Sequence, residues 1–484
     1  MGHRSHAFDR EAEFEVAEQS RDSIVDFVTG LRWKDLPARV QRQASMCILD
    51  ALGAMLAGTR VPAAWISADY ALATLPGSSA TVVARGRPSS TLGAAFANGV
   101  AANGIDVDDC GIYTWGHPGA QIVPAALAVA EERRMSGRAL LEALVVGYEI
   151  AFRAARCSHD FHDVYRSCGS WGSVACAAVA ARLMGLSKKE TSHALGIADY
   201  DSPFLPMMRD IDHPAMVKHG IGVGALTGIM SAQLAERGFT GTPALIETTR
   251  YQTWVGDLGE RYLLDGGVTW KEHSCCAWTH PALLALTKVR KAHDIDPERV
   301  VRIEVETFHQ ACRLHVKAPM TTEEAQFSLP WTLAVMLVDG EVGPDQVLET
   351  RLGDPQVARL AASVVSRSND EFTELHALAE DFDPAGMDPA VVRIRLDDGT
   401  VFDSGVVDFP LRQMSREELR RKFHRVAGSV LGCSQREAVI ELVEGLDEEA
   451  GVAGLVAALL PAGTEAGSLS SSDPELASGG DVWV

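Results

Sequence analysis

The sequence predicts a mainly helical protein, in which a large all-helical domain, discontinuous in sequence, carries an inserted smaller α+β lid domain. Up to about residue 250 the apolar residues recur at helical spacing, with little strand-like alternation. Alternating segments then appear, and helical spacing resumes after Pro410. The predicted units are residues 20–268 and 409–462 for the helical domain, 269–408 for the lid and 463–484 for a disordered tail.

The helical part begins with Ile24, Phe27, Val28 and Leu31, which fall at positions i, i+3, i+4 and i+7. The same spacing predicts further helices over residues 46–57, 91–100, 124–132, 137–153, 172–184, 190–197 and 222–236. Several of these are rich in Ala and Gly. Small residues let helices approach closely, so we expect a compact, layered helical body.

The lid is indicated by strict alternation of apolar and polar residues over residues 300–307 and 391–396. Asp398-Gly399 then predicts a hairpin turn, with a returning strand over residues 401–407. Helices are predicted within the lid over residues 281–291, 329–337 and 356–366, and after it over 416–431 and 434–446.

Charge and cysteine content narrow the class of protein. The chain has 484 residues with 44 Lys and Arg against 65 Asp and Glu, a net charge of −21. This acidity argues against nucleic acids and anionic membranes as partners, although a local site can still bind an anionic small molecule. The nine cysteines show no paired framework, the first twenty residues lack an apolar signal segment, and no apolar run reaches about 18 residues. We therefore expect a cytoplasmic protein.

Familiar cofactor and metal motifs are absent from the sequence. There is no GxxxxGK[ST], no GxGxxG after a strand and no HExxH, and Cys275-Cys276 lack CxxC spacing. The segment from Asp106 to Gly111 begins like a calcium loop, but its twelfth position is His117, where a bidentate Glu is required. We therefore expect no metal in this loop.

The most informative segment joins two predicted helices. An apolar helix runs into Asp106, Asp108 and Asp109, and a loop then delivers His117-Pro-Gly at the start of the next helix. Acids beside a histidine at a helix N-terminus suit acid/base chemistry. The alternative interpretation is helix capping with a solvated acidic turn.

Three other segments bring polar groups together. His159 and His162, at i, i+3, could share one helix face, although such a pair is more often structural. Lys218 precedes an Ala/Gly-rich helix, where a cation and a helix N-terminus could hold an anion together; the alternative is an exposed lysine. Lys271 lies among aromatic and thiol residues at the predicted domain junction, a usual place for ligand sites.

In order and spacing, these segments resemble the MmgE/PrpD family, which contains 2-methylcitrate dehydratase, cis-aconitate decarboxylase and iminodisuccinate epimerase. The resemblance extends from about residue 20 to about residue 450. The segments that carry it are Asn103-Gly-Ile-Asp106-Val-Asp108-Asp109, His117-Pro-Gly, Gly147-Tyr148-Glu149, Gly169-Ser-Trp-Gly172, Arg237-Gly-Phe-Thr-Gly241, Lys271 with Cys275-Cys276 and Thr279-His280-Pro281, and Phe327-Ser-Leu-Pro330.

The resemblance implies a cofactor-independent homodimeric lyase with its site in a cleft between the helical domain and the lid. It implies proton abstraction next to a carboxylate of a small carboxylic acid, with loss of water or CO₂. Two alternatives remain open: an epimerase or isomerase on the same fold, and a non-catalytic ligand-binding member of the family.

The resemblance also suggests which residues act. The catalytic candidates are Asp106, His117, His162 and Lys271, with His159 as the alternative to His162. The substrate-binding candidates are Lys218, Arg166, Arg209, His280 and Trp331, with Lys218 and Arg209 competing for one basic position of the family. Two acids, Asp210 and Asp212, lie where a tricarboxylate binder is expected to be basic. A substrate with fewer carboxylates or a bulkier apolar part would fit this difference.

Overall fold

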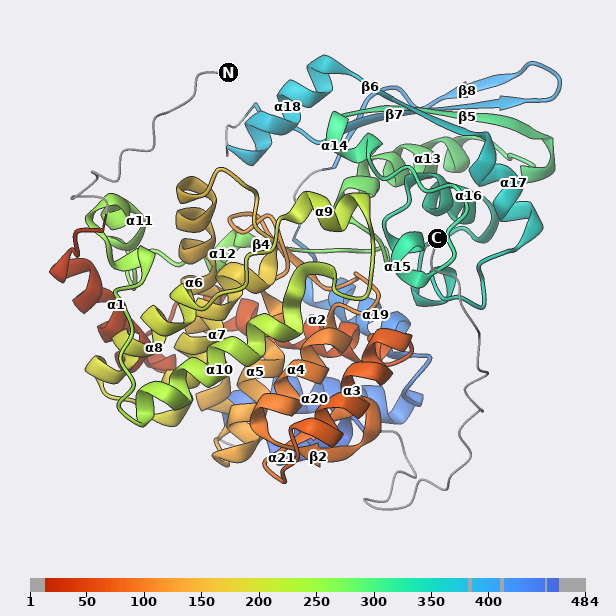
Figure 1. The fold of residues 1–484 in the computed structure, drawn as a ribbon. Coiled ribbons are helices and arrows are strands. Elements are labelled where there is room, and N and C mark those ends of the chain that lie inside the picture. Colours follow the sequence, from red (N-terminus) through yellow and green to blue (C-terminus); the bar gives the residue numbers. More distant parts are fainter. Residues whose placement is uncertain (1–13, 382–384, 410–412, 449–450, 461–484) are drawn as a thin grey trace.

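The computed structural model describes residues 14–381, 385–409, 413–448 and 451–460. It confirms the predicted fold class, a mainly helical protein with a small α+β region (Figure 1). The predicted tail, residues 463–484, lies outside the described residues. The helices before the lid are α1 Glu18–Gly30, α2 Ala38–Gly58, α3 Pro62–Thr74, α4 Thr91–Ala102, α5 Gly119–Glu132, α6 Gly137–Phe161, α7 Cys168–Met184, α8 Lys188–Tyr200, α9 Met207–Asp212, α10 Ile221–Glu236, α11 Gln252–Val255 and α12 Leu264–Gly267.

Each predicted helix of the body is present, and most are longer than their apolar spacing indicated. Serine side chains cap the starts of α4 and α6, where Ser90 and Ser136 accept hydrogen bonds from backbone N–H groups of the first turn. Helix α3 was not predicted. Its large apolar residues, including Ile66 and Tyr70, are exposed and its small alanines are buried, so its sequence shows no single apolar face.

The expected close packing of Ala- and Gly-rich helices is observed. A Cβ atom on Gly58 of α2 would lie only 1.8 Å from the carbonyl oxygen of Ala101 in α4. A Cβ atom on Gly99 of α4 would lie 3.1 Å from Cα of Gly222 in α10. These helices therefore meet backbone to backbone, which only glycine at the contact allows. Helix α10 also packs along α7.

We use "lid" for residues 269–408. Its strands are β4 Val268–Trp270 (starting one residue earlier), β5 Val300–Thr307, β6 Val364–Ser368, β7 Pro389–Leu396, β8 Val401–Asp403 and β9 Val407–Asp408. Its helices are α13 His280–Ala292, α14 His309–Cys312, α15 Thr322–Gln326, α16 Leu329–Asp339, α17 Pro355–Ser363 and α18 Asp370–Glu380. The sheet has the order β6-β5-β7-β8, with β9 also on β7; only β5 and β6 are parallel.

The prediction of one lid helix was partly wrong. The helix expected over residues 356–366 ends at Ser363, and Val364 to Ser368 form β6 beside β5. The β-branched pair Val364-Val365 suits a strand, and Val364 is buried. Helix α18 was not predicted.

Short strands before residue 250 were also missed: β1 Ala80–Val82, β2 Arg87–Ser89 and β3 Asp109–Gly111. Three residues are too few for alternation to be recognisable. Strand β3 pairs antiparallel with β4, with Asp109 opposite Trp270. This pairing places the α4–α5 connection beside Lys271, the first residue after β4.

After the lid, α19 Arg416–Ala427, α20 Cys433–Glu444 and α21 Ala453–Ala458 return to the body, and α19 packs on α2 (Figure 1). The exact domain boundaries stay a prediction. Among the described helices, none is by itself long and apolar enough to cross a membrane. Helices α2 and α3 together have the length and apolar composition of a membrane span, but the chain bends by 93° between them.

Candidate active site

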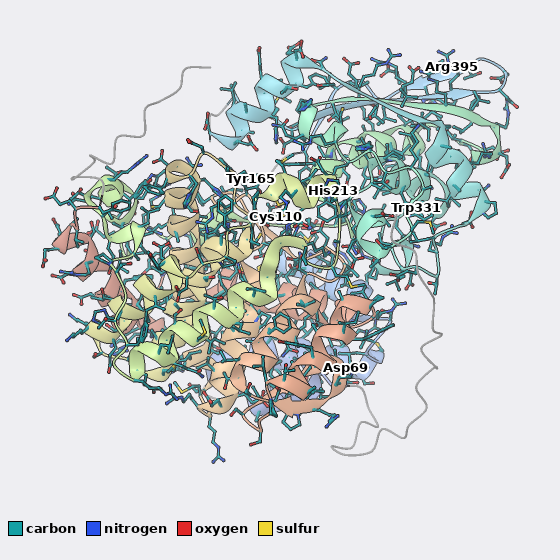
Figure 2. All side chains as sticks on the ribbon, in the orientation of Figure 1. Asp69, Cys110, Tyr165, His213, Trp331 and Arg395 are labelled. Carbon is teal, nitrogen blue, oxygen red and sulfur yellow. The ribbon has the colours of Figure 1, made fainter. Side chains whose placement is uncertain are left out.

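A cavity of about 160 Å³ opens where the α4–α5 connection, the start of α10 and the lid come together. Asp106, His117, His219 and Lys271 line it, and we call these four residues the central group. Its other walls include Cys110 and Tyr165, which Figure 2 places at the junction of the body and the lid. The cavity therefore lies at the junction that the sequence predicted for the site.

The backbone at this cavity is held in an unusual conformation. Four non-glycine residues of the described chain have positive φ, and three of them line the cavity: Asp106, Trp115 and His219, with φ of 52°, 48° and 60°. The left-handed region costs free energy for residues with a Cβ and is concentrated at functional sites. This clustering is an independent indication that the cavity is functional.

Asp106 and Lys271 form a fully buried ion pair. Nζ of Lys271 donates to Oδ1 of Asp106 at 2.6 Å, and each side chain is 1% exposed. Burial opposes the charge of Asp106, but Lys271 and then His117 outweigh it and keep its pKa below the ordinary value. Burial likewise opposes the charge of Lys271, and Asp106 raises its pKa. Oδ2 of Asp106 has no hydrogen-bond partner among the described residues, and the Lys271 ammonium has two further N–H groups.

His117 is held as a cation by the acidic segment that precedes it. Its Nδ1 lies 2.8 Å from the carbonyl oxygen of Asp109 and 3.1 Å from Oδ2 of Asp108. Two acceptors at Nδ1 keep a proton there, and the Nε2 atom lies 3.4 Å from Oδ1 of Asp106. Burial favours the neutral ring, but Asp108 overcomes this and raises the pKa of His117 well above its ordinary value.

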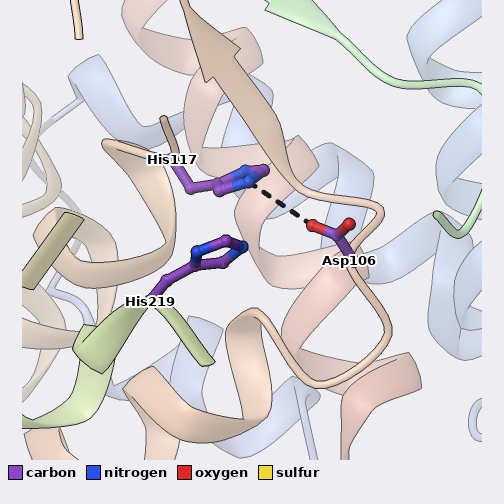
Figure 3. A group of neighbouring side chains, drawn as sticks. All are labelled: Asp106, His117 and His219. Atoms are coloured by element: carbon purple, nitrogen blue, oxygen red, sulfur yellow. Dashed lines mark ion pairs between the residues drawn. The ribbon is translucent and has the colours of Figure 1, made fainter. Parts of the chain in front are cut away.

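The pKa of His219 is displaced in the opposite direction from that of His117. Burial, reinforced by the nearby cation of His117, lowers its pKa well below the ordinary value. Its Nδ1 lies 3.2 Å from Oγ of Ser167, and its backbone N–H donates to Asp210. Its Nε2 is buried without a hydrogen-bond partner in the described structure. Ring centroids of His117 and His219 are 4.9 Å apart, so a protonated and a neutral imidazole lie side by side (Figure 3).

Asp106, His117 and His219 also offer three ligand atoms within 4.8 Å of one another, a spacing that a metal ion could bridge. The ammonium of Lys271 already occupies one oxygen of Asp106. A second cation beside it would be repelled in a buried, low-dielectric place. The donor set therefore suits proton transfer better than metal binding.

Of the nine residues predicted for the site, the structure brings Asp106, His117 and Lys271 together at the cavity. His162 and Arg166 lie together elsewhere: Nη1 of Arg166 is 2.8 Å from Nε2 of His162, and neither lines the cavity. The expectation that His159 and His162 share a helix face was wrong, because α6 ends at Phe161 and His162 is extended. His159 stacks on Trp115, with ring centroids 4.6 Å apart.

The other predicted binding residues also lie outside the cavity wall. Lys218 is buried in a turn before α10 and donates to the Gln326 side chain, while Arg209 is exposed on α9. His280 begins α13 with Nδ1 3.2 Å from the carbonyl oxygen of Cys276. Trp331 is buried within the lid, where its Nε1 donates to the carbonyl oxygen of Gln346 (Figure 2).

Sequence reasoning missed His219 and the lid residues of the cavity. His219 follows Lys218 directly, and the lysine drew attention because a cation suits a carboxylate. The available signal was its place one residue before Gly220, which has φ of 62° and directly precedes α10.

Comparison with known proteins identifies the family of the chain. Residues 22–255 match the model of the MmgE/PrpD N-terminal domain, and residues 273–448 match that of the C-terminal domain. The chain belongs to the MmgE/PrpD family. Its relatives include cis-aconitate decarboxylase of Aspergillus terreus, 26% identical over 89% of this chain and 96% of the relative. The human cis-aconitate decarboxylase is 25% identical over 88% and 92% of the two chains. The 2-methylcitrate dehydratase of Cupriavidus necator is 25% identical over 81% and 85%.

Proposed function

We propose that this MmgE/PrpD protein is a lyase that removes a proton next to a carboxylate of a small carboxylic acid and releases water or CO₂. One observation carries the proposal: two adjacent imidazoles in one cavity, with pKa values displaced in opposite directions. Such a pair assigns an acid and a base. The relatives' names, a decarboxylase and a dehydratase, support the same class of reaction.

In the proposed reaction, the two free N–H groups of Lys271 bind the substrate carboxylate. Nε2 of His219 takes the proton from the carbon next to it, and the electron pair moves into the carboxylate, where Lys271 stabilises the added charge. The pair then forms the double bond as the C–O bond breaks, and the N–H of His117 protonates the leaving hydroxyl. Decarboxylation needs no proton abstraction: the C–C bond to CO₂ breaks, its electron pair stays on the remaining carbon, and the N–H of His117 protonates that carbon.

The geometry favours elimination over epimerisation. An epimerase needs acid and base groups on opposite faces of one carbon. Ring centroids 4.9 Å apart leave no room for a carbon between His117 and His219. An epimerase would therefore need a different second group.

Product analysis tests the proposal. The purified protein is incubated with a panel of di- and tricarboxylic acids, hydroxy acids and unsaturated acids in D₂O, and mass spectrometry follows loss of water or CO₂. Either loss, abolished by Lys271→Met, supports the lyase. Deuterium exchange without any loss would identify an epimerase, and ligand-induced thermal stabilisation without either would identify a binding protein.

The proposal also includes three expectations drawn from the resemblance and the cysteine pattern: independence of a cofactor, a homodimer and a cytoplasmic location. Light scattering during size-exclusion chromatography tests the dimer. Dialysis against a chelator should leave turnover unchanged, because Lys271 takes the place of a metal cation at Asp106. A loss of activity that returns with one divalent metal would contradict this.

A further inference from the structure

The cavity has a second group of charged residues, contributed by the lid. His376 and Glu380 on α18 and Asp388 before β7 all line it, and we call these three residues the lid triad. Nδ1 of His376 is 2.6 Å from Oδ1 of Asp388, and its Nε2 is 3.3 Å from Oε1 of Glu380. Within the described chain no ion pair joins the lid triad to the central group.

The lid triad is held firmly. The His376 side chain is 3% exposed and stacks on Phe308, with ring centroids 4.0 Å apart and planes at 16°. Trp278 packs edge-on against it at 6.0 Å. A buried imidazole between two carboxylates is favoured as a cation, so the triad combines two negative charges with one positive charge.

Cations are scarce on the rest of the cavity wall. Lys271 is the one lysine or arginine among the described residues that line it, and it already forms an ion pair with Asp106. Most of the other large side chains that line the cavity are apolar or aromatic: Trp115, Tyr165, Met207, Ile211, Trp278 and Phe409. One carboxylate can be matched at Lys271, but a second one at the lid triad would face Glu380 and Asp388, with no free lysine or arginine among the described lining residues.

We propose that the substrate is a carboxylate with an apolar body whose far end carries a hydrogen-bond donor, an ammonium or hydroxyl group, which the Glu380 carboxylate accepts. This inference rests on the proposed function, because it needs the carboxylate at Lys271. Glu380 is half-buried, and its carboxylate has acceptor sites beyond the one facing His376. An acid with a second carboxylate at its far end is rejected by the same residues.

Calorimetric titration with four six-carbon acids tests the inference: hexanoate, 6-hydroxyhexanoate, 6-aminohexanoate and adipate. We expect 6-aminohexanoate to bind at least tenfold more tightly than adipate, with 6-hydroxyhexanoate between them. Glu380→Gln should reduce the ratio of the two dissociation constants at least threefold, and Asp388→Asn should act in the same direction. Glu374→Gln is the matched control, since Glu374 is exposed on the same helix and does not line the cavity.

The outcomes separate the two proposals. Lys271→Met should weaken all four acids alike, and circular dichroism checks that each variant is folded. If Lys271→Met weakens them but adipate binds best, or the ratio is unchanged in both Glu380→Gln and Asp388→Asn, the inference about the lid triad is wrong and the proposed function stands. If none of the acids shows binding that depends on Lys271, the proposed function falls, and this inference with it.

Discussion

His117 and His219 show how neighbours alone separate two identical side chains. Both rings are buried, and burial by itself disfavours the charge of either. His117 faces the carboxylate of Asp108 and keeps its proton. His219 has Lys218, Lys271 and the charged His117 around it and loses its proton. The assignment of His117 therefore depends on Asp108, nine positions before it, whereas that of His219 depends on His117 and Lys271, more than fifty positions away.

Replacing either imidazole should remove its proton transfer. We expect His219→Ala and His117→Ala each to lower kcat by roughly 10²- to 10⁴-fold on the acid identified by product analysis, the usual contribution of one general acid or base. His213→Ala is the control. His213 is exposed on the connection between α9 and α10, which also carries His219, and this variant should keep wild-type turnover (Figure 2). Wild-type rates in His219→Ala would remove the assignment of the base.

His376 makes a prediction about stability and pH. Burial opposes its charge, but Asp388 and Glu380 raise its pKa to about 9, above the 6.5 of a free histidine. The folded protein thus holds this proton more tightly than the unfolded chain does. The resulting stability is fully present below pH 6.5 and is lost as the pH rises through about 9.

Urea unfolding at pH 7 and pH 9 measures this contribution. The wild-type free energy of unfolding should fall by about 1–3 kcal/mol between the two values, as expected for a pKa raised by two units or so. In His376→Gln the fall should be smaller by that amount. His309→Gln, a change at an exposed histidine of α14, should leave the wild-type fall intact.

At the scale of elements, α19 fixes the loop that carries Asp106. Nζ of Lys422 on α19 donates to Oδ1 of Asp50 on α2 at 2.5 Å and to the carbonyl oxygen of Val107 at 2.7 Å. Burial raises the pKa of Asp50 to about 6 in spite of this ammonium. The lysine thus joins two helices, far apart in sequence, to the residue next to Asp106.

Lys422→Met should destabilise the fold by about 3–5 kcal/mol, because it leaves the Asp50 carboxylate buried without its cation. The double variant Asp50→Asn with Lys422→Met should recover part of that loss. Arg421→Met, which removes an exposed pair with Glu417 on the same helix, should cost no more than about 1 kcal/mol. Thermal or urea unfolding compares the three, and equal losses in Lys422→Met and Arg421→Met would contradict the anchoring role.

At the scale of the whole molecule, the net charge of −21 opposes an anionic substrate. The central group offsets this locally with Lys271 and the charged His117. Exposed charges are screened by salt, whereas buried ones are screened much less. Salt should therefore weaken the repulsion at a distance more than the attraction within the cavity.

For a substrate of net negative charge, we expect kcat/KM to rise by roughly twofold between 10 and 150 mM salt, over which the screening length shortens from about 30 to about 8 Å. A substrate whose far ammonium cancels the carboxylate should show no such rise. The rise should come from KM, with kcat unchanged. Steady-state kinetics at matched pH measures it. A fall in kcat/KM would mean that the surface field attracts the substrate, contrary to this expectation.

Much of the fold could be predicted because its signals are local. Apolar spacing located the helices of the body, and alternation located β5 and β7 to within two residues. The prediction missed elements in which that signal is weak. Helix α3 buries alanines and exposes its large apolar residues, and β1, β2 and β3 have three residues each. Strand β6 was predicted as the end of a helix, because α17 ends at Ser363 and the strand begins at the next residue.

The sequence alone determined the fold class, the family and three of the cavity residues, Asp106, His117 and Lys271, because these depend on local patterns and on motif order. Only the tertiary structure decided which other groups share the cavity. Pairing of β3 with β4 brings Lys271 to Asp106, the turn before α10 presents His219 instead of Lys218, and α18 adds His376 and Glu380. Such contacts, and the pKa shifts they cause, depend on distances between remote segments, which packing sets and local sequence does not encode.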